Sequence, residues 1–169
     1  MLFFNIDTHF WKGKYVANTA ATVDQLKQDL QNLALEGATD LYAAANAITE
    51  SKWVTEGDSR PDLFLLSDGG ATWGETDLRI IGQRLQNADC SSLFAYQTGL
   101  TGSAISNLRF LAGQSGGAVF SVASEEEIQT ASTAHRARPW KLTSVAGEGA
   151  RDILSAGRVE YVYLSLIHI

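Results

Sequence analysis

The stretch Pro61-Asp62-Leu63-Phe64-Leu65-Leu66-Ser67-Asp68-Gly69-Gly70 decides the fold class of this chain. Four apolar residues run without a polar break, and the composition then changes abruptly to Ser-Asp-Gly-Gly. A short apolar run bounded by turn residues predicts a strand buried on both faces of a parallel sheet. Ligands of such sheets bind outside the carboxyl ends of the strands, so Asp68 is expected at the rim of a site. The alternative is a structural Asp in a strand-to-loop turn.

Predicted strands alternate with predicted helices on both sides of this stretch. Strands are expected at Leu2–Trp11, at Tyr15–Val16 as a short return strand, at 63–67, at 92–96 and at 117–122. Helices are expected after a cap at Thr22, after Thr39-Asp40, after Thr76 or Asp77, at 103–112, and after Ser124, which opens a capping box. This alternation predicts an α/β three-layer sandwich with a mostly parallel sheet and an edge hairpin.

Composition restricts the classes of partner. The 169 residues are 45% hydrophobic, enough for a sizeable core, and the formal net charge is -6. The chain lacks a basic stripe that could neutralise phosphates, so nucleic acid is not an expected partner. The apolar runs fall short of the roughly 18 residues of a membrane span. Cys90 is the single cysteine, which rules out a disulfide within the chain.

The texture of the sequence changes after Pro139. We expect one α/β domain over residues 1–137 and the start of a following β-rich domain over 138–163. The last six residues, 164–169, resemble a translated sequencing-library transposon end, so His168 is not interpreted as a ligand. The alternative is a genuine terminal strand, which the composition of this segment also permits.

Two short motifs place oxygen donors at loops expected on one edge of the sheet. They are Gly37-Ala38-Thr39-Asp40 and Ser67-Asp68-Gly69. Hydroxyl and carboxylate oxygens suit a hard divalent cation such as Mg²⁺, which keeps several waters and takes one or two carboxylates. In this order, with one helix between them, the motifs resemble two of the three loops of the metal-ion-dependent adhesion site in von Willebrand factor type A domains. The resemblance covers about residues 1–135.

The resemblance implies a role for each residue. Thr39 would ligate Mg²⁺, or Mn²⁺ or Ca²⁺, through its hydroxyl, and Asp68 would act directly or through a water. Asp40 would be a helix cap or would support the ligands through hydrogen bonds. Ser67, Gly69 and Trp73 would lie at the rim of the site. The alternative is that Thr39 or Asp40 merely caps the helix that follows.

The chain departs from the family pattern at the first loop. The Asp-x-Ser-x-Ser segment of the family is absent, and Asp7 is followed instead by Thr8-His9-Phe10-Trp11. We therefore interpret Leu2–Trp11 as the second strand of the family, with the first strand and its loop missing. Metal binding is then expected to be weaker than millimolar. The second strand would pair directly with the strand ending at Ser67, or the gap would leave an aggregation-prone edge.

The resemblance implies binding and not catalysis. The metal would hold an open position that an acidic side chain of a partner protein completes, as in large bacterial proteins that join such domains to other modules. The alternative is an enzyme or nucleotide-binding domain whose catalytic loop lies in the missing N-terminal part. Gly113-Gln114-Ser115-Gly116-Gly117 matches a nucleophile elbow in composition, but a helix is expected before it and a strand after it, which is the reverse of the required order.

Overall fold

The structure of the chain is a computed structural model that describes residues 1–33, 37–55, 60–98, 104–122 and 124–136. These residues form two compact units, each described here by itself. Unit 1 comprises Met1–Pro61 and Gly70–Cys90, and unit 2 comprises Asp62–Gly69 and the residues from Ser91 onward. The predictions of a β-rich domain at 138–163 and of a sequencing scar at 164–169 lie outside the described residues.

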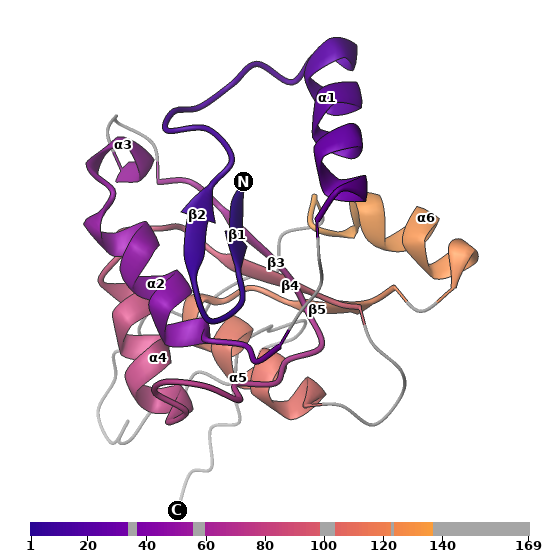
Figure 1. Cartoon of the computed structure of the whole chain (residues 1–169). Helices are drawn as coiled ribbons and strands as arrows, with labels where there is room; N and C mark the ends of the chain where they lie inside the picture. Colours follow the sequence, from indigo (N-terminus) through magenta and orange to yellow (C-terminus); the bar gives the residue numbers. More distant parts are fainter. Residues whose placement is uncertain (34–36, 56–59, 99–103, 123, 137–169) are drawn as a thin grey trace, which may run out of the picture. The chain divides into compact units, whose positions relative to one another are not determined.

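Unit 2 is built on a parallel three-stranded sheet in the order β3-β4-β5 (Figure 1). The strands are β3 (Leu63–Ser67), β4 (Leu93–Gln97) and β5 (Val119–Ser121). Helix α5 (Ile105–Ser115) packs on β4 and β5, and α6 (Glu125–Ala134) packs on β5. The buried apolar residues of this unit are Leu93, Phe94, Ala95, Leu108, Leu111, Ala112 and Ala131. The parallel sheet with crossover helices confirms the predicted α/β class.

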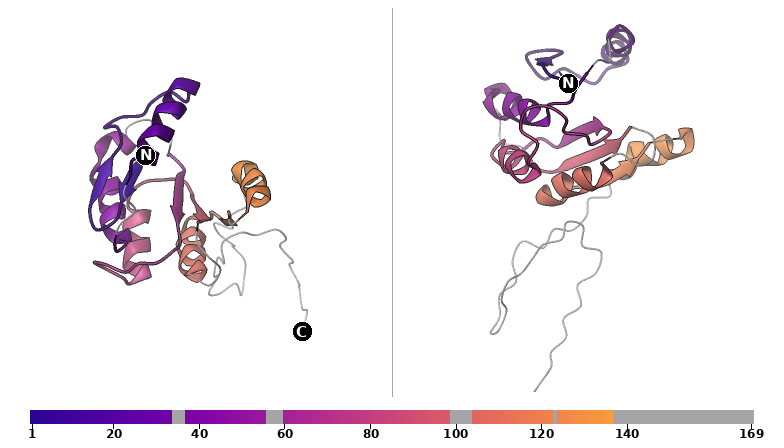
Figure 2. Two further views of the ribbon diagram at one scale, coloured as in Figure 1. Left: turned by 45° about the vertical axis from the view of Figure 1, so that its right-hand side comes forward. Right: turned by 60° about the horizontal axis from the view of Figure 1, so that its bottom comes forward.

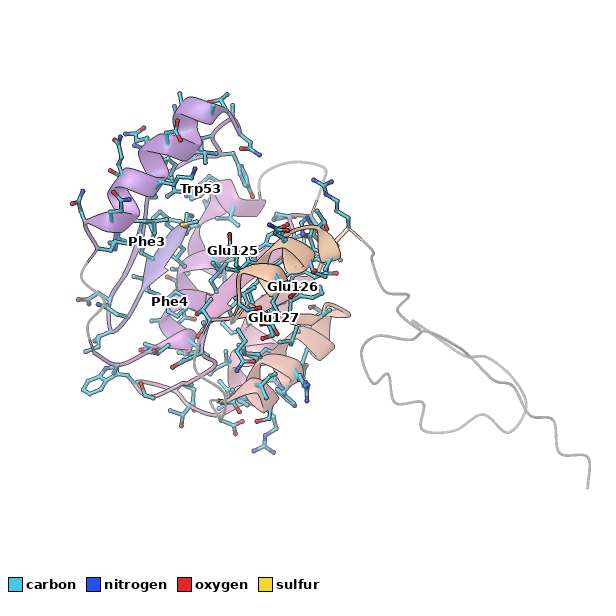
Figure 3. The ribbon with its side chains drawn as sticks, turned by 90° about the vertical axis from the view of Figure 1, so that its right-hand side faces the viewer. Phe3, Phe4, Trp53, Glu125, Glu126 and Glu127 are labelled. Atoms are coloured by element: carbon cyan, nitrogen blue, oxygen red, sulfur yellow. The ribbon has the colours of Figure 1, made fainter. Side chains whose placement is uncertain are left out.

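The ends of the two helices of unit 2 follow their sequence signals closely but not completely. Glu127 and Ser124 form the predicted capping box at the start of α6, where Glu125, Glu126 and Glu127 make up the first turn (Figure 3). The helix expected at 103–112 ends later than predicted, because α5 continues to Ser115. It ends at Gly116, whose φ of 75° is the left-handed conformation that glycine adopts most readily.

Unit 1 begins with an antiparallel hairpin of β1 (Leu2–Phe4) and β2 (Thr8–Phe10). The prediction of one strand over Leu2–Trp11 with a return strand at Tyr15–Val16 is therefore wrong. The chain turns at Asn5–Asp7 instead, where the Asp7 N–H donates to Asn5 Oδ1 at 2.8 Å. Such a local side-chain bond makes Asn a turn former inside an otherwise alternating pattern. A hairpin is present, but its turn comes earlier in the sequence and its strands are shorter than the alternation of apolar and polar residues indicated.

Four helices complete unit 1, and two of them form its centre. They are α1 (Ala20–Gln31), α2 (Leu41–Glu50), α3 (Lys52–Thr55) and α4 (Leu78–Gln86) (Figures 1 and 2). Helix α2 packs on α4, and the Arg84 guanidinium of α4 donates to Glu50 of α2 at 3.1 Å. Thr19 and not Thr22 caps α1, because the Thr22 N–H donates to Thr19 Oγ1. The buried apolar residues here are Leu41, Ala44, Ala45, Val54, Ile81 and Ala88.

Strand β3 is less covered than its sequence indicated. Phe64 and Leu66 are 48% and 59% exposed, while Leu63 and Leu65 are half-buried. The expectation of a strand buried on both faces is therefore wrong. Direct pairing of the N-terminal strand with β3 is wrong as well, since β1 and β2 form a sheet of their own. Within the described residues, β4 is the only strand that pairs with β3.

Gly117→Ala should destabilise unit 2, because a Cβ at this position would overlap the backbone carbonyl of Leu93. Overpacking of this kind costs about 1–3 kcal/mol, which urea denaturation can measure. Gly113→Ala is the matched control, because Gly113 lies inside α5 with open space around it. That substitution should leave stability unchanged or raise it by about 0.5–1 kcal/mol. Equal losses in both variants would contradict the close packing of Gly117 on β4.

Candidate functional site

The residues expected to form a site are divided between the two units. Thr39, Asp40 and Trp73 belong to unit 1. Ser67, Asp68 and Gly69 belong to unit 2. Each half is described by itself, and the sharing of one ion by Thr39 and Asp68 stays a prediction.

In unit 1 the backbone of Thr39 is joined to the loop that follows Gly70. The Thr39 N–H donates to Thr72 Oγ1 at 2.8 Å, and the Thr39 carbonyl accepts from the N–H groups of Thr72 and Trp73 at 3.0 and 3.2 Å. These three bonds fix the backbone on both sides of the Thr39 side chain. Among the described residues, no hydrogen bond uses the Thr39 hydroxyl itself. The hydroxyl is thus held in place by its backbone and remains available to a ligand.

Asp40 caps α2, as the sequence indicated. Its Oδ1 accepts from the Ala43 N–H at 2.7 Å, and its own N–H donates to the Asn5 carbonyl at 2.8 Å. Gly74 has a φ of 65°, and a Cβ there would overlap the Asp40 carboxylate. The carboxylate is therefore enclosed between the first turn of α2 and the Gly74 backbone. This position suits a residue that orients the loop beside a ligand and not one that faces the ligand directly.

Trp73 lies on the same loop, with a side chain that is 54% exposed. The Trp73 N–H donates to the Thr39 carbonyl, and this bond fixes the backbone that carries the exposed indole. An exposed Trp on a fixed backbone is the kind of residue that contributes apolar contact area to a partner. The structure shows this exposure, and the role of Trp73 at the rim of a site stays a prediction.

The helix after this loop begins with an exposed ion pair. Asp77 caps α4 by accepting from the Arg79 N–H, and the Arg79 guanidinium donates to Asp77 Oδ2 at 2.9 Å. The hydrogen bonds from Arg79 lower the pKa of Asp77 below its usual value. The Asp77 carboxylate is therefore engaged in hydrogen bonds at the start of its own helix. Of the two predicted caps, Thr76 and Asp77, it is Asp77 that caps α4.

In unit 2 a tight turn at the carboxyl end of β3 presents Asp68. Ser67 is buried, and its Oγ accepts from the Gly69 N–H at 3.0 Å. Gly69 has a φ of 86°, and its carbonyl accepts from Asn107 Nδ2 at 3.0 Å. A Cβ on Gly69 would meet the Ala104 carbonyl and the Leu108 side chain. The residues on either side of Asp68 thus face the start of α5, while Asp68 itself is exposed.

Two residues that shape these loops were not predicted from the sequence. Thr72 supplies the acceptor for the Thr39 N–H, and Asn107 holds the Gly69 carbonyl. Neither lies in a recognisable motif, because each side chain forms its hydrogen bond with a residue more than thirty positions away in the sequence. The spacing of small residues after Asp68, in Gly69-Gly70-Ala71-Thr72, is the one local signal of a loop that approaches another backbone closely.

The chemistry of the predicted ligands can be compared with that of Mg²⁺ for each unit by itself. One uncommitted hydroxyl on Thr39 and one exposed carboxylate on Asp68 are the ligand types that Mg²⁺ accepts, with water in the remaining positions. In the part of the chain that the structure describes, no three His, Cys, Asp or Glu side chains gather in a metal-binding group. The described residues therefore form no structural cluster of the zinc type, and a cation site with mostly water ligands stays a prediction.

Ser115 has a structural role that removes it from consideration as a nucleophile. Its Oγ donates to the Ala112 carbonyl at 3.1 Å and accepts from the Leu93 N–H at 2.7 Å. The residue ends α5, and β5 follows it, so the reversed order of the Gly-x-Ser-x-Gly pattern is confirmed. The hydroxyl ties the start of β4 to the end of α5.

Comparison with known proteins supports the fold. No protein-family model matches the chain, and no curated protein matches it. A solved structure with a similar fold is an aerotolerance-related membrane protein from Bacteroides fragilis NCTC 9343, studied with multiple mutations to serines. The TM-score is 0.58 at 12% sequence identity, and the similarity covers 82% of this chain and 76% of that one. At this identity the likeness establishes a shared α/β architecture.

The described helices were also compared with the length and hydropathy that a bilayer requires. None of them is long and apolar enough to cross a membrane.

Thr72→Val should weaken the junction between the Thr39 loop and the loop after Gly70. The substitution keeps the shape of the side chain but removes the acceptor of the Thr39 N–H, which costs about 1 kcal/mol of unfolding free energy. The amide hydrogen of Thr39 should also exchange faster with solvent. Thr76→Val is the matched control, since Thr76 is exposed and forms none of the hydrogen bonds described for this loop. Unchanged exchange at Thr39 in Thr72→Val would contradict the junction.

Proposed function

We propose that this chain is a metal-dependent protein-binding module of the von Willebrand factor type A class. The observation that carries the proposal is the state of its two best donors. The Thr39 hydroxyl is uncommitted at the start of α2, and the Asp68 carboxylate is exposed at the carboxyl end of a parallel strand. The sheet of parallel strands and the similarity to a solved α/β protein are consistent with that class.

Each residue has a defined task under this proposal. Thr39 would hold Mg²⁺, Mn²⁺ or Ca²⁺ through its hydroxyl, and Asp68 would do so directly or through a water. Asp40 keeps the Thr39 loop in place by capping α2. The bound cation would act as a Lewis acid with an exchangeable position. An acidic side chain of the partner protein would complete that position, and Trp73 would add apolar contact beside it.

The hydrogen bonds of Ser115 and His135 favour a binding function over catalysis. A hydrolase would need a nucleophile next to a general base, and Ser115 is instead bonded to the backbone of Ala112 and Leu93. His135 lies far from that hydroxyl in sequence and shares its Nδ1 with the Tyr96 hydroxyl at 3.2 Å. We therefore put forward no second function.

Mn²⁺ added at millimolar concentration should broaden the backbone amide signals of Thr39 and Asp68 together in the NMR spectrum. Thr39→Ala should reduce the broadening at Asp68 as well as at residue 39, because a shared ion loses a ligand from the other loop. Thr76→Ala is the control that removes a nearby exposed hydroxyl outside the proposed site. Undiminished broadening at Asp68 in Thr39→Ala would refute the shared ion, even if manganese still bound there.

Partner binding should require both the cation and a carboxylate. In the presence of Mg²⁺, a peptide with a single Asp should shift the Trp73 indole signal, and the matched peptide with Asn should not. Chelation with EDTA and the substitution Asp68→Ala should each abolish the effect. Equal shifts from the Asp and Asn peptides would contradict the proposed role of the open coordination position.

A further inference from the structure

The turn of the β1–β2 hairpin is hydrogen-bonded to the loop that carries Thr39. The Asp40 N–H donates to the Asn5 carbonyl at 2.8 Å, and Figure 1 shows the turn beside the start of α2. At Gly37, on the same loop, a Cβ would lie 4.0 Å from Ile6 Cδ1, so the Ile6 side chain reaches the backbone of that loop. All of these residues belong to unit 1. The turn and the Thr39 loop are therefore parts of one surface.

The turn is fixed by hydrogen bonds of its own. The Asn5 N–H donates to the Asp7 carbonyl at 2.9 Å, and the Asp7 N–H donates to Asn5 Oδ1 at 2.8 Å. The antiparallel ladder of β1 and β2 holds its two ends. Met1 lies at the opposite end of the hairpin, where its carbonyl accepts from the Trp11 N–H. A surface element that is fixed before binding loses little conformational entropy when a partner contacts it.

The peptide group between Thr39 and Asp40 joins two exposed parts of unit 1. No cis peptide bond occurs among the described residues, and in a trans peptide the C=O and N–H groups point in opposite directions. The N–H donates to Asn5 of the turn, and the C=O accepts from the Trp73 N–H at 3.2 Å. The turn and Trp73 therefore lie on opposite sides of this group. Their exposed apolar side chains, Ile6 at 44% and Trp73 at 54%, flank the loop with the Thr39 hydroxyl.

The turn also carries a carboxylate that its surroundings do not neutralise. The Asp7 side chain is exposed, and within the described ranges it forms no hydrogen bond or ion pair. Two other carboxylates of the adjoining loops are engaged locally. Asp40 accepts from the Ala43 N–H, and Glu75 accepts from the Asp77 N–H. Asp7 is thus the carboxylate of this surface that attracts a basic group on a partner and repels an acidic one.

We propose that the Asn5–Asp7 turn is a second contact for the partner protein and selects a segment with Lys or Arg close to its metal-binding acidic residue. This inference rests on the metal-dependent binding proposed above. Asp7 pairs with the basic side chain of the segment. Ile6 and Trp73 contact apolar side chains beside the acidic residue, one from each side of the Thr39 loop. An acidic segment without a basic residue still binds through the cation, but more weakly.

Two peptides added to the 169-residue chain in millimolar Mg²⁺ separate these contacts. One is acetyl-Gly-Lys-Leu-Asp-Leu-Lys-Gly-amide, and the other has Gln in place of both Lys residues. Both should shift the Trp73 indole and Ile6 methyl signals in the NMR spectrum. The Lys peptide should bind about two- to fivefold more tightly at low salt, which is the range of an exposed ion pair. In about 0.5 M NaCl this preference should largely disappear, because salt screens exposed charges.

Two pairs of variants test the turn. Asp7→Asn should remove the preference for the Lys peptide and leave affinity for the Gln peptide unchanged, since the turn bonds of Asp7 use its backbone. Asp24→Asn removes the same charge from α1 and should keep the preference. Ile6→Ala should weaken both peptides about fivefold. Val16→Ala is the control, at a position that is 43% exposed and outside the turn, and it should change neither affinity.

The outcomes distinguish the turn from the metal site. Equal affinity of the two peptides in Mg²⁺, or a Lys preference that survives Asp7→Asn, would overturn the role of the turn and leave the metal-dependent module standing. An Ile6 methyl signal that does not move while the Trp73 signal shifts would do the same. Failure of both peptides to bind in Mg²⁺ would overturn the proposed function, and this inference with it.

Discussion

The turn that ends β3 is the constraint on which the candidate site depends. Ser67 is buried, and its hydroxyl oxygen accepts a hydrogen bond from the Gly69 N–H. Gly69 adopts a left-handed conformation with no space for a side chain. Asn107 holds the Gly69 carbonyl from α5. Residues 67 and 69 are thereby packed inward, and Asp68 between them must face outward. A buried donor and acceptor left unpaired here would cost more than the bonds themselves contribute, so the turn has little freedom.

The second half of the site is governed by backbone bonds and not by side-chain ligands. Thr39 is held through its N–H and C=O by Thr72 and Trp73, and Asp40 is held as the cap of α2. The backbone groups of Thr39 and the Asp40 cap are hydrogen-bonded in this way, whereas the Thr39 hydroxyl forms no hydrogen bond among the described residues. A loop fixed through its main chain can present such a hydroxyl without the entropy cost of ordering a flexible segment on binding.

Strand β3 combines two properties that are rarely left together. Its sequence is that of an interior strand, yet Phe64 and Leu66 are exposed and their amides lie on an open edge. The rings of Phe94, Tyr96 and Phe120 contact one another across neighbouring strands and stabilise the sheet from within.

The sequence by itself determined the elements of this protein whose signals are local. The apolar run at 63–66, the Asp40 cap and the capping box of Ser124 each depend on residues within a few positions, so their strand and helices could be predicted. The position of Asp68 at the end of a parallel strand followed from the same rule. The roles of Thr72 and Asn107, the tight hairpin of β1 and β2, and the exposure of Phe64 were decided by tertiary structure alone. Each depends on which segments meet across long stretches of chain, and a side chain's burial is set by what covers it and not by its own hydrophobicity.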